Sequence, residues 1–150
     1  MRIGGLTLAA AVVAAACGGS PEPPSPTCAG SPDAASSTGG LSFDGVYQHP
    51  VSDYTQYLRF YADQTVITVS AKGSDPSQLA SWFHKGSSIV GTGTYTLNGA
   101  AISFTVTSTE GAVSYQGLVC ADSVSLQVHS LINGNRATST YSFAAVAFTE

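Results

Sequence analysis

Apolar and polar residues alternate along the last two thirds of the chain. Ile102, Phe104 and Val106 are separated by Ser103 and Thr105, and the same alternation recurs in residues 124–129 and 140–143. In an extended strand this places apolar side chains on one face and Ser or Thr on the other. The pattern is typical of an antiparallel sheet with one buried and one wet face.

Turn signals divide this region into short segments. Asn98-Gly99, Glu110-Gly111 and the residues 133–135 (Asn-Gly-Asn) follow one another at intervals typical of β-hairpins. Together with the alternation they predict eight strands, which cover residues 43–48, 55–61, 65–70, 89–97, 101–108, 112–120, 123–131 and 136–148.

A single helix is expected between the third and fourth strands. Asp75 is placed as its N-cap, Pro76 at its first position and Gln78 where a capping box has its third residue. The apolar stripe of this two-turn helix, which we expect to pack against the sheet wall or over an open end, consists of Leu79, Trp82 and Phe83.

Eight sequential antiparallel strands favour an up-and-down barrel, because closure removes the exposed sheet edges. A two-sheet sandwich is the alternative. Gly91 and Gly93 are expected where a strand bends at a barrel corner. The residues expected in the barrel interior are Tyr47, Leu58, Phe60, Tyr95, Ile102, Phe104, Val106, Tyr115, Leu126, Val128, Tyr141 and Phe143.

The composition agrees with a β-protein and limits its partners. Hydrophobic residues make up 43% of the chain and charged residues 9%, against a usual share of about 25% charged residues. The net charge is −4, with five Lys and Arg in total. So few cations cannot form a basic patch, so we expect no nucleic-acid partner. We expect a monomer.

The first residues have the pattern of a secretory signal. Arg2 is followed by an uncharged apolar run over residues 3–16, which is too short to span about 30 Å of hydrocarbon. Ala15-Ala16-Cys17 then resembles the lipobox of bacterial lipoproteins. The resemblance implies cleavage before Cys17, lipidation of its thiol and attachment to a membrane. Gly18, where Asp would resemble an inner-membrane retention signal, favours the outer membrane; a plain signal peptide is the alternative.

Three segments are therefore expected: a lipoprotein signal peptide over residues 1–16, a lipidated Cys with a disordered tether rich in Gly, Pro and Ser over residues 17–40, and the barrel over residues 41–150. Two further cysteines remain. Cys28 and Cys120 form a bridge in one interpretation, and in the other Cys120 is buried and free while Cys28 is exposed.

Two short motifs resemble lipocalins and other calycins. Residues 43–47 (Phe-Asp-Gly-Val-Tyr) are similar to the Gly-x-Trp start of that superfamily, and residues 57–63 (Tyr-Leu-Arg-Phe-Tyr-Ala-Asp) resemble a hairpin of lipocalin-like bacterial proteins. The resemblance implies a lipocalin-like barrel. It also implies that an Arg of the last strand packs across Tyr47, which replaces the Trp, and Arg136 is the candidate.

Catalytic and metal-binding motifs are missing from the sequence. His49, His84 and His129 do not have the spacing of metal ligands. No nucleophile elbow, zinc-protease motif or phosphate loop occurs. We therefore expect no enzyme activity, no metal and no cofactor.

Tyrosines on the strands are the remaining candidates for a site. Five of them (Tyr57, Tyr61, Tyr95, Tyr115 and Tyr141) line a ligand pocket in one interpretation and simply fill the barrel in the other. Arg59 is expected to be exposed and stacked on neighbouring rings, and the alternative is a buried contact with an anion. The leading hypothesis is a lipid-anchored envelope lipoprotein that binds a small apolar or amphipathic molecule. The alternative is a filled structural or protein-interaction module of the outer membrane.

Overall fold

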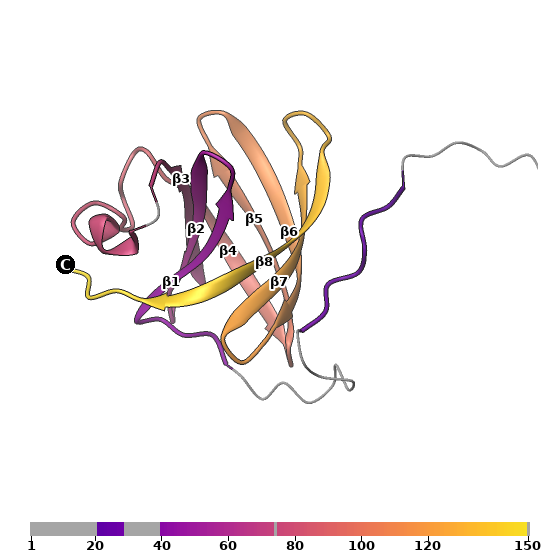
Figure 1. Ribbon diagram of the computed structural model, residues 1–150, viewed down its shortest axis with the longest axis horizontal. Coiled ribbons are helices and arrows are strands. Elements are labelled where there is room, and N and C mark those ends of the chain that lie inside the picture. The colour runs from indigo at the N-terminus through magenta and orange to yellow at the C-terminus, as the bar shows by residue number, and fades with distance from the viewer. Residues whose placement is uncertain (1–20, 29–39, 74, 150) are drawn as a thin grey trace, which may run out of the picture.

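The chain folds into a closed barrel of eight antiparallel strands in sequence order, with β8 paired back to β1 (Figure 1). This computed structural model describes residues 21–28, 40–73 and 75–149. The expected all-β, up-and-down barrel is confirmed, and the sandwich is wrong. The strands are β1 (Gly45–Val51), β2 (Tyr54–Phe60), β3 (Thr65–Ala71), β4 (Gly91–Asn98), β5 (Ala101–Ser108), β6 (Gly111–Val119), β7 (Ser123–Ser130) and β8 (Arg136–Ala145).

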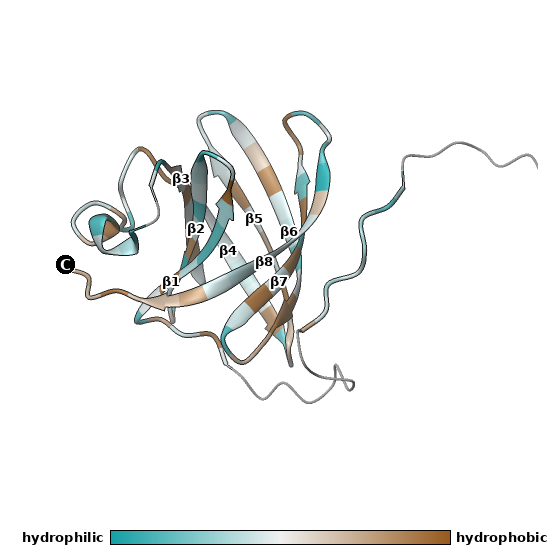
Figure 2. Cartoon of the chain, in the orientation of Figure 1, coloured by the Kyte–Doolittle hydropathy of each residue, from teal (hydrophilic) through white to brown (hydrophobic). Residues whose placement is uncertain are grey.

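Alternation and glycine placement set the barrel's curvature. Figure 2 shows apolar positions alternating with polar ones along β5, whose apolar side chains face inward. Gly93 and Gly117 lie where strands approach closely: an added Cβ would fall 2.0 Å from the Thr105 carbonyl oxygen and 1.9 Å from that of Ser125, respectively. Any larger residue would push the neighbouring strand away, so both positions need glycine.

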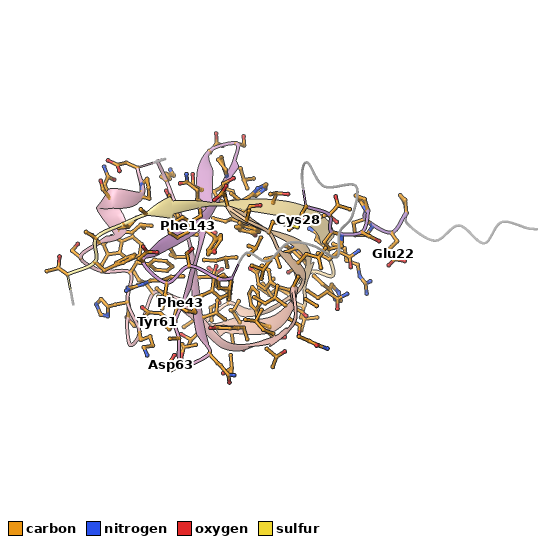
Figure 3. The ribbon with its side chains drawn as sticks, turned by 90° about the horizontal axis from the view of Figure 1, so that it is seen from below. Glu22, Cys28, Phe43, Tyr61, Asp63 and Phe143 are labelled. Atoms are coloured by element: carbon orange, nitrogen blue, oxygen red, sulfur yellow. A yellow bond between two sulfur atoms is a disulfide. The ribbon has the colours of Figure 1, made fainter. Side chains whose placement is uncertain are left out.

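Aromatic side chains pack together inside the barrel. Phe60 makes edge-to-face contacts with Tyr47, Tyr95 and Phe104, and Phe104 stacks on Tyr115 with 4.7 Å between ring centroids. Figure 3 shows side chains crowding the inside of the ring of strands. All twelve residues expected in the interior belong to this inner cluster or pack against it.

The two ends of the barrel differ. At the end formed by the β2–β3, β4–β5 and β6–β7 turns, Leu41 packs against the inner cluster and the Ser42 backbone N–H donates a 2.9 Å hydrogen bond to the Tyr47 hydroxyl. We call this the closed end. The opposite end, formed by the β1–β2, β5–β6 and β7–β8 turns, is called the open end.

The helix between β3 and β4 is shorter than expected. It is a 3-10 helix, η1 (Pro76–Leu79), whose N-cap Asp75 accepts a hydrogen bond from the Ser77 N–H at 2.9 Å. One short helix between these strands is confirmed, with its cap and its proline where they were expected, but it has four residues of 3-10 helix in place of the two expected turns. So few residues cannot hold a helix by their own hydrogen bonds. The burial of Leu79 and Phe83 against the barrel instead determines the path of the chain.

A second apolar layer covers the outer wall of β1–β3. Val46, Tyr57 and Ile67 point outward there and pack under Leu79 and Phe83, together with residues that follow β8. β8 ends at Ala145 and not near residue 148, because the chain leaves the sheet to join this layer. The outward position of Tyr57 and Tyr61 shows that neither lines the barrel interior.

Arg59 lies inside this outer layer. It is 5% exposed, its Nη1 donates a 2.8 Å hydrogen bond to the Phe83 carbonyl, and its guanidinium stacks 3.4 Å from the Phe148 ring centroid and 4.6 Å from that of Tyr61. The expected exposed arginine is therefore wrong, while the expected stacking on rings is present. Phe148 comes from the end of the chain and covers a side chain that would otherwise face water.

Residues 21–28 lie along the outer wall of the barrel (Figures 1 and 3). Cys28 forms a disulfide with Cys120, which resolves the two interpretations left open by the sequence. The Thr27 N–H donates a 3.2 Å hydrogen bond to the Ser125 hydroxyl, and the Gln127 amide donates at 3.3 Å to the carbonyl of the residue 23 proline. These contacts attach residues 21–28 of the expected tether to the barrel, and residues 17–20 and 29–39 of it lie outside the described residues.

No helix in the described part of the chain is long and apolar enough to cross a bilayer. Cys17 and the signal segment lie outside the described residues.

Candidate functional site

The open end holds a cup of about 500 Å³. Its lining comes from inward positions near the ends of β2, β3, β5, β6 and β7. The aromatic cluster below it blocks passage toward the closed end. The barrel is therefore filled in its closed half and hollow in its open half.

The floor of the cup carries hydrogen-bonding groups. Tyr115 reaches Thr68 there, and the Tyr141 hydroxyl donates a 2.9 Å hydrogen bond to Oε1 of Gln56. Within the described residues the Gln56 side-chain amide makes no other hydrogen bond, so its N–H groups remain as donors to a ligand. Burial raises the pKa of Tyr141 far above its usual value, and it also raises the pKa of Tyr115. Both phenols therefore stay neutral hydroxyls and cannot serve as bases near pH 7.

The walls of the cup are apolar and its mouth is mixed. Val106, Val113 and Val128 line the sides, with hydroxyl-bearing residues above them and Ile89 at the mouth. Glu110 in the β5–β6 turn is the one charged residue among the described lining residues. The surface offered to a ligand is therefore amphipathic and, below the mouth, uncharged.

The three histidines lie apart. His49 stacks near Tyr141, with 5.3 Å between ring centroids, and its Nδ1–H donates to the Thr140 carbonyl at 3.0 Å. His84 follows η1, and His129 is on β7 beyond the cup lining. Among the described residues no three His, Cys, Asp or Glu side chains gather as a metal site would require.

Sequence reasoning found only part of the cup. Of the expected interior residues, Val106, Tyr115 and Val128 line it, and the others contribute to the packed cluster. The polar lining was missed. A signal was present, because Gln56 and Ser108 lie two positions from the inward-facing Leu58 and Val106, so they share the inward face.

The floor contact implied by the calycin resemblance is not formed. Arg136 is exposed at the start of β8, near the open end, and pairs with His129 across the strands. Tyr47 instead packs against Phe60 and Phe143 and accepts the Ser42 hydrogen bond at the closed end.

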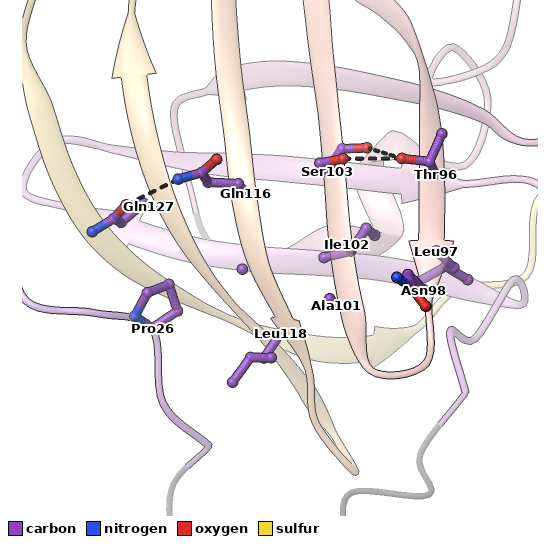
Figure 4. A pocket seen from close by; sticks show the side chains of 11 residues that line it. Pro26, Thr96, Leu97, Asn98, Ala101, Ile102, Ser103, Gln116, Leu118 and Gln127 are labelled. Carbon is purple, nitrogen blue, oxygen red and sulfur yellow. Dashed lines mark hydrogen bonds between the residues drawn. The ribbon is translucent and has the colours of Figure 1, made fainter. Parts of the chain in front are cut away.

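A second hollow lies on the outside of the barrel. It is a shallow groove of about 470 Å³ across β4–β7, bounded on one side by Pro26 (Figure 4). The polar pairs Thr96–Ser103 and Gln116–Gln127 hydrogen-bond to each other across its surface, at 2.9 and 3.3 Å. Because these groups already satisfy each other and the groove faces solvent, the cup is the better candidate site.

The fold and this cup define a closed eight-stranded β-barrel with a single open end. Comparison of the chain with protein-family models, curated proteins and solved structures gave no match in any of the three.

Proposed function

We propose that the protein is a lipid-anchored lipoprotein of the bacterial outer membrane, without catalytic activity, whose barrel binds one small, neutral, amphipathic molecule in the cup at its open end. The observation that supports the binding role is that side chains fill the closed half of the barrel, while the cup in the open half is not filled. A barrel of eight strands holds either side chains or one small ligand, and this barrel divides its length between the two.

The size and chemistry of the cup support a small ligand. Its volume of about 500 Å³ is within the usual range of about 300–1,000 Å³ for ligand pockets. A ligand with a hydroxyl, ester or amide group would hydrogen-bond to Gln56, and its apolar part would contact Val106 and Val128. A charged head on the floor would lose its hydration without an opposite charge in return, so the cup favours neutral ligands.

The binding test compares adjacent positions on β5. Ser108 lines the cup, whereas Thr107 is exposed on the outer face. Using the neutral fluorescent probe N-phenyl-1-naphthylamine, we expect Ser108→Trp to weaken binding at least tenfold and Thr107→Trp to leave it unchanged. Gln56→Leu should weaken binding of a monoacylglycerol, with Gln116→Leu on the outer wall as its control. Equal binding by Ser108→Trp and Thr107→Trp would exclude the cup as the site.

The anchor test concerns Cys17. Wild-type protein in its native host should incorporate radiolabelled palmitate and fractionate with membranes, whereas Cys17→Ala should do neither. Several acyl chains on one residue anchor stably, because each buried CH₂ contributes about 0.8 kcal/mol. Absence of label in the wild type would contradict the lipoprotein assignment.

The second candidate is a filled module that contacts another envelope protein. The packed aromatic cluster around Phe60 favours it, since that half of the barrel has no room for a ligand. Failure of the wild type to bind both the naphthylamine probe and the monoacylglycerol would select this candidate.

A further inference from the structure

Residues 21–28 are held in one direction along the barrel. The C-terminal residue of the segment, Cys28, is joined to the closed end of the barrel by its disulfide with Cys120, which directly follows β6. Nearer the N-terminus of the segment, Gln127 and Thr138 donate hydrogen bonds to the carbonyls of Pro23 and Pro24. The segment therefore runs along β7 and β8 as a fixed strap (Figure 1).

The strap ends beside the open end. Glu22 and Pro23 line a pocket together with His129 and Arg136. His129 and Arg136 form the last cross-strand pair before the β7–β8 turn. The chain N-terminal to Pro21 therefore starts next to the open end.

Chain length limits how far Cys17 can lie from that point. Four residue steps separate Cys17 from Pro21, and a fully extended chain covers about 14 Å in that distance. The eight residues of β7 span about 26 Å, or about 20 Å along the axis of a barrel with ordinary strand tilt. A lipid on Cys17 therefore lies within reach of the open end and out of reach of the closed end.

The open end also carries most of the large apolar side chains that face water. Ile89, Leu131 and Ile132 are 65%, 55% and 54% exposed, and Tyr54 in the same rim is also exposed. Ile132 leans over the start of β6, where its Cγ1 lies 2.6 Å from the position of a Cβ added to Gly111. Among the described residues, the other exposed large apolar side chains are Phe43 and Leu97, at the closed end.

We propose that the open rim, made of Tyr54, Ile89, Leu131 and Ile132, docks onto the lipid bilayer that holds the anchor, so that the cup opens toward the membrane. The proposal rests on the lipid anchor of the proposed function. The partner of the rim is the lipid surface itself, because the strap places the anchor at the same end of the barrel as the rim. Interfacial contact of Leu, Ile and Tyr side chains with a bilayer follows from their apolar area. The ligand of the cup would then be a neutral amphiphile with a single chain, which enters the cup from the bilayer.

The charges of the open end balance one another: Asp53 and Glu110 lie in its turns, and the exposed Lys72 and Arg136 lie directly after β3 and at the start of β8. The contact with lipid therefore depends on the apolar rim and not on charged headgroups, so zwitterionic phosphatidylcholine is a suitable surface for the test.

The test places a fluorescent reporter at each end of the barrel. In the acylated full-length protein with Trp82→Phe as background, Leu131→Trp reports on the open end. Leu97→Trp is its matched control at the closed end, since Leu97 is 47% exposed. In vesicles of dibrominated phosphatidylcholine, whose bromines quench tryptophan at close range, we expect at least threefold stronger quenching for Leu131→Trp than for Leu97→Trp.

Equal quenching at the two positions, or stronger quenching of Leu97→Trp, would overturn the proposal. An unquenched Leu131→Trp whose emission changes with protein concentration would assign the rim to a second copy of the chain, and would also overturn it. Mass spectrometry of the same samples separates these outcomes from failure of the anchor, because a protein without acyl mass on Cys17 contradicts the proposed function itself.

Discussion

Truncation of Phe104 tests whether the closed half of the barrel is a packed core. Phe104 is 5% exposed, stacks on Tyr115 at 4.7 Å and meets Phe60 edge-on at 5.5 Å between ring centroids. Phe104→Ala removes both ring contacts and leaves a cavity among aromatic side chains that cannot collapse to fill it. Such truncations cost about 3–5 kcal/mol, and we expect about 4 kcal/mol here. That is a large share of the roughly 5–15 kcal/mol stability of an ordinary domain.

The assay is urea unfolding followed by circular dichroism, with Thr105→Ala as the control on the next residue. Thr105 is exposed on the outer face, so its truncation should change the free energy of unfolding by no more than about 0.5 kcal/mol. Val106→Ala should lie between the two, at about 1–2 kcal/mol, because Val106 borders a space that is already empty. A loss below about 1.5 kcal/mol for Phe104→Ala would refute the packed interior and extend the cup toward the closed end.

Three further predictions concern the parts around the core. Cys28→Ser with Cys120→Ser opens a loop with a sequence separation of 92 residues and should lower the free energy of unfolding by about 2–5 kcal/mol, read from urea midpoints; an unchanged midpoint would contradict it. Phe83→Ala should destabilise by about 3–5 kcal/mol and Trp82→Ala by less, since Phe83 is fully buried and Trp82 only partly; thermal melts that reverse this order would show that the outer layer is not docked as described. Burial raises the pKa of Tyr141, so the tyrosine ionises at a lower pH in the unfolded chain than in the folded one. Its contribution to the free energy of unfolding is therefore fully present below about pH 10 and falls above it by up to about 1.4 kcal/mol per pH unit. Tyr141→Phe should reduce this decline in melts recorded at different pH values.

Most of the barrel could be predicted because its determinants are local. The alternation in β5 and β7 and the Asn98-Gly99 turn specify strands and hairpins over a few residues each. Eight such strands in a row leave few topologies, since closure is the simplest way to remove two open edges.

The outer layer could not be predicted because its contacts are distant in sequence. Arg59 is covered by Phe148 and bonded to Phe83, and nothing near Arg59 in the sequence indicates either partner. One signal was available: Val66 and Ile67 are adjacent apolar residues, so β3 has apolar side chains on both faces. Such a run is typical of a strand buried on both sides.

The cup and the strap were missed for different reasons. The cup depends on inward-facing positions that change from aromatic residues to Gln, Thr and Ser toward the open end. An interior predicted from apolar residues alone does not include these positions. The strap has the composition of a disordered linker, with four prolines between residues 21 and 26. Proline keeps such a segment extended but leaves its carbonyls available, and Gln127 and Thr138 use two of them.

The division of the barrel separates stability from binding. The packed aromatic cluster lies in the closed half, and the outer layer reinforces β1–β3 while the strap reinforces β7 and β8. Ser108 lines the cup at the end of β5, away from these supports, and its exchange opens no cavity in the core. Gln56 lies on β2 and accepts the hydrogen bond of the buried Tyr141 hydroxyl, so its exchange lowers stability as well as binding. Variants of Ser108 should therefore change ligand binding while keeping the melting temperature close to that of the wild type, and variants such as Phe104→Ala should do the reverse. A Ser108 variant that lost binding and stability together would show that the open half is part of the core and would remove the physical basis for a ligand site there.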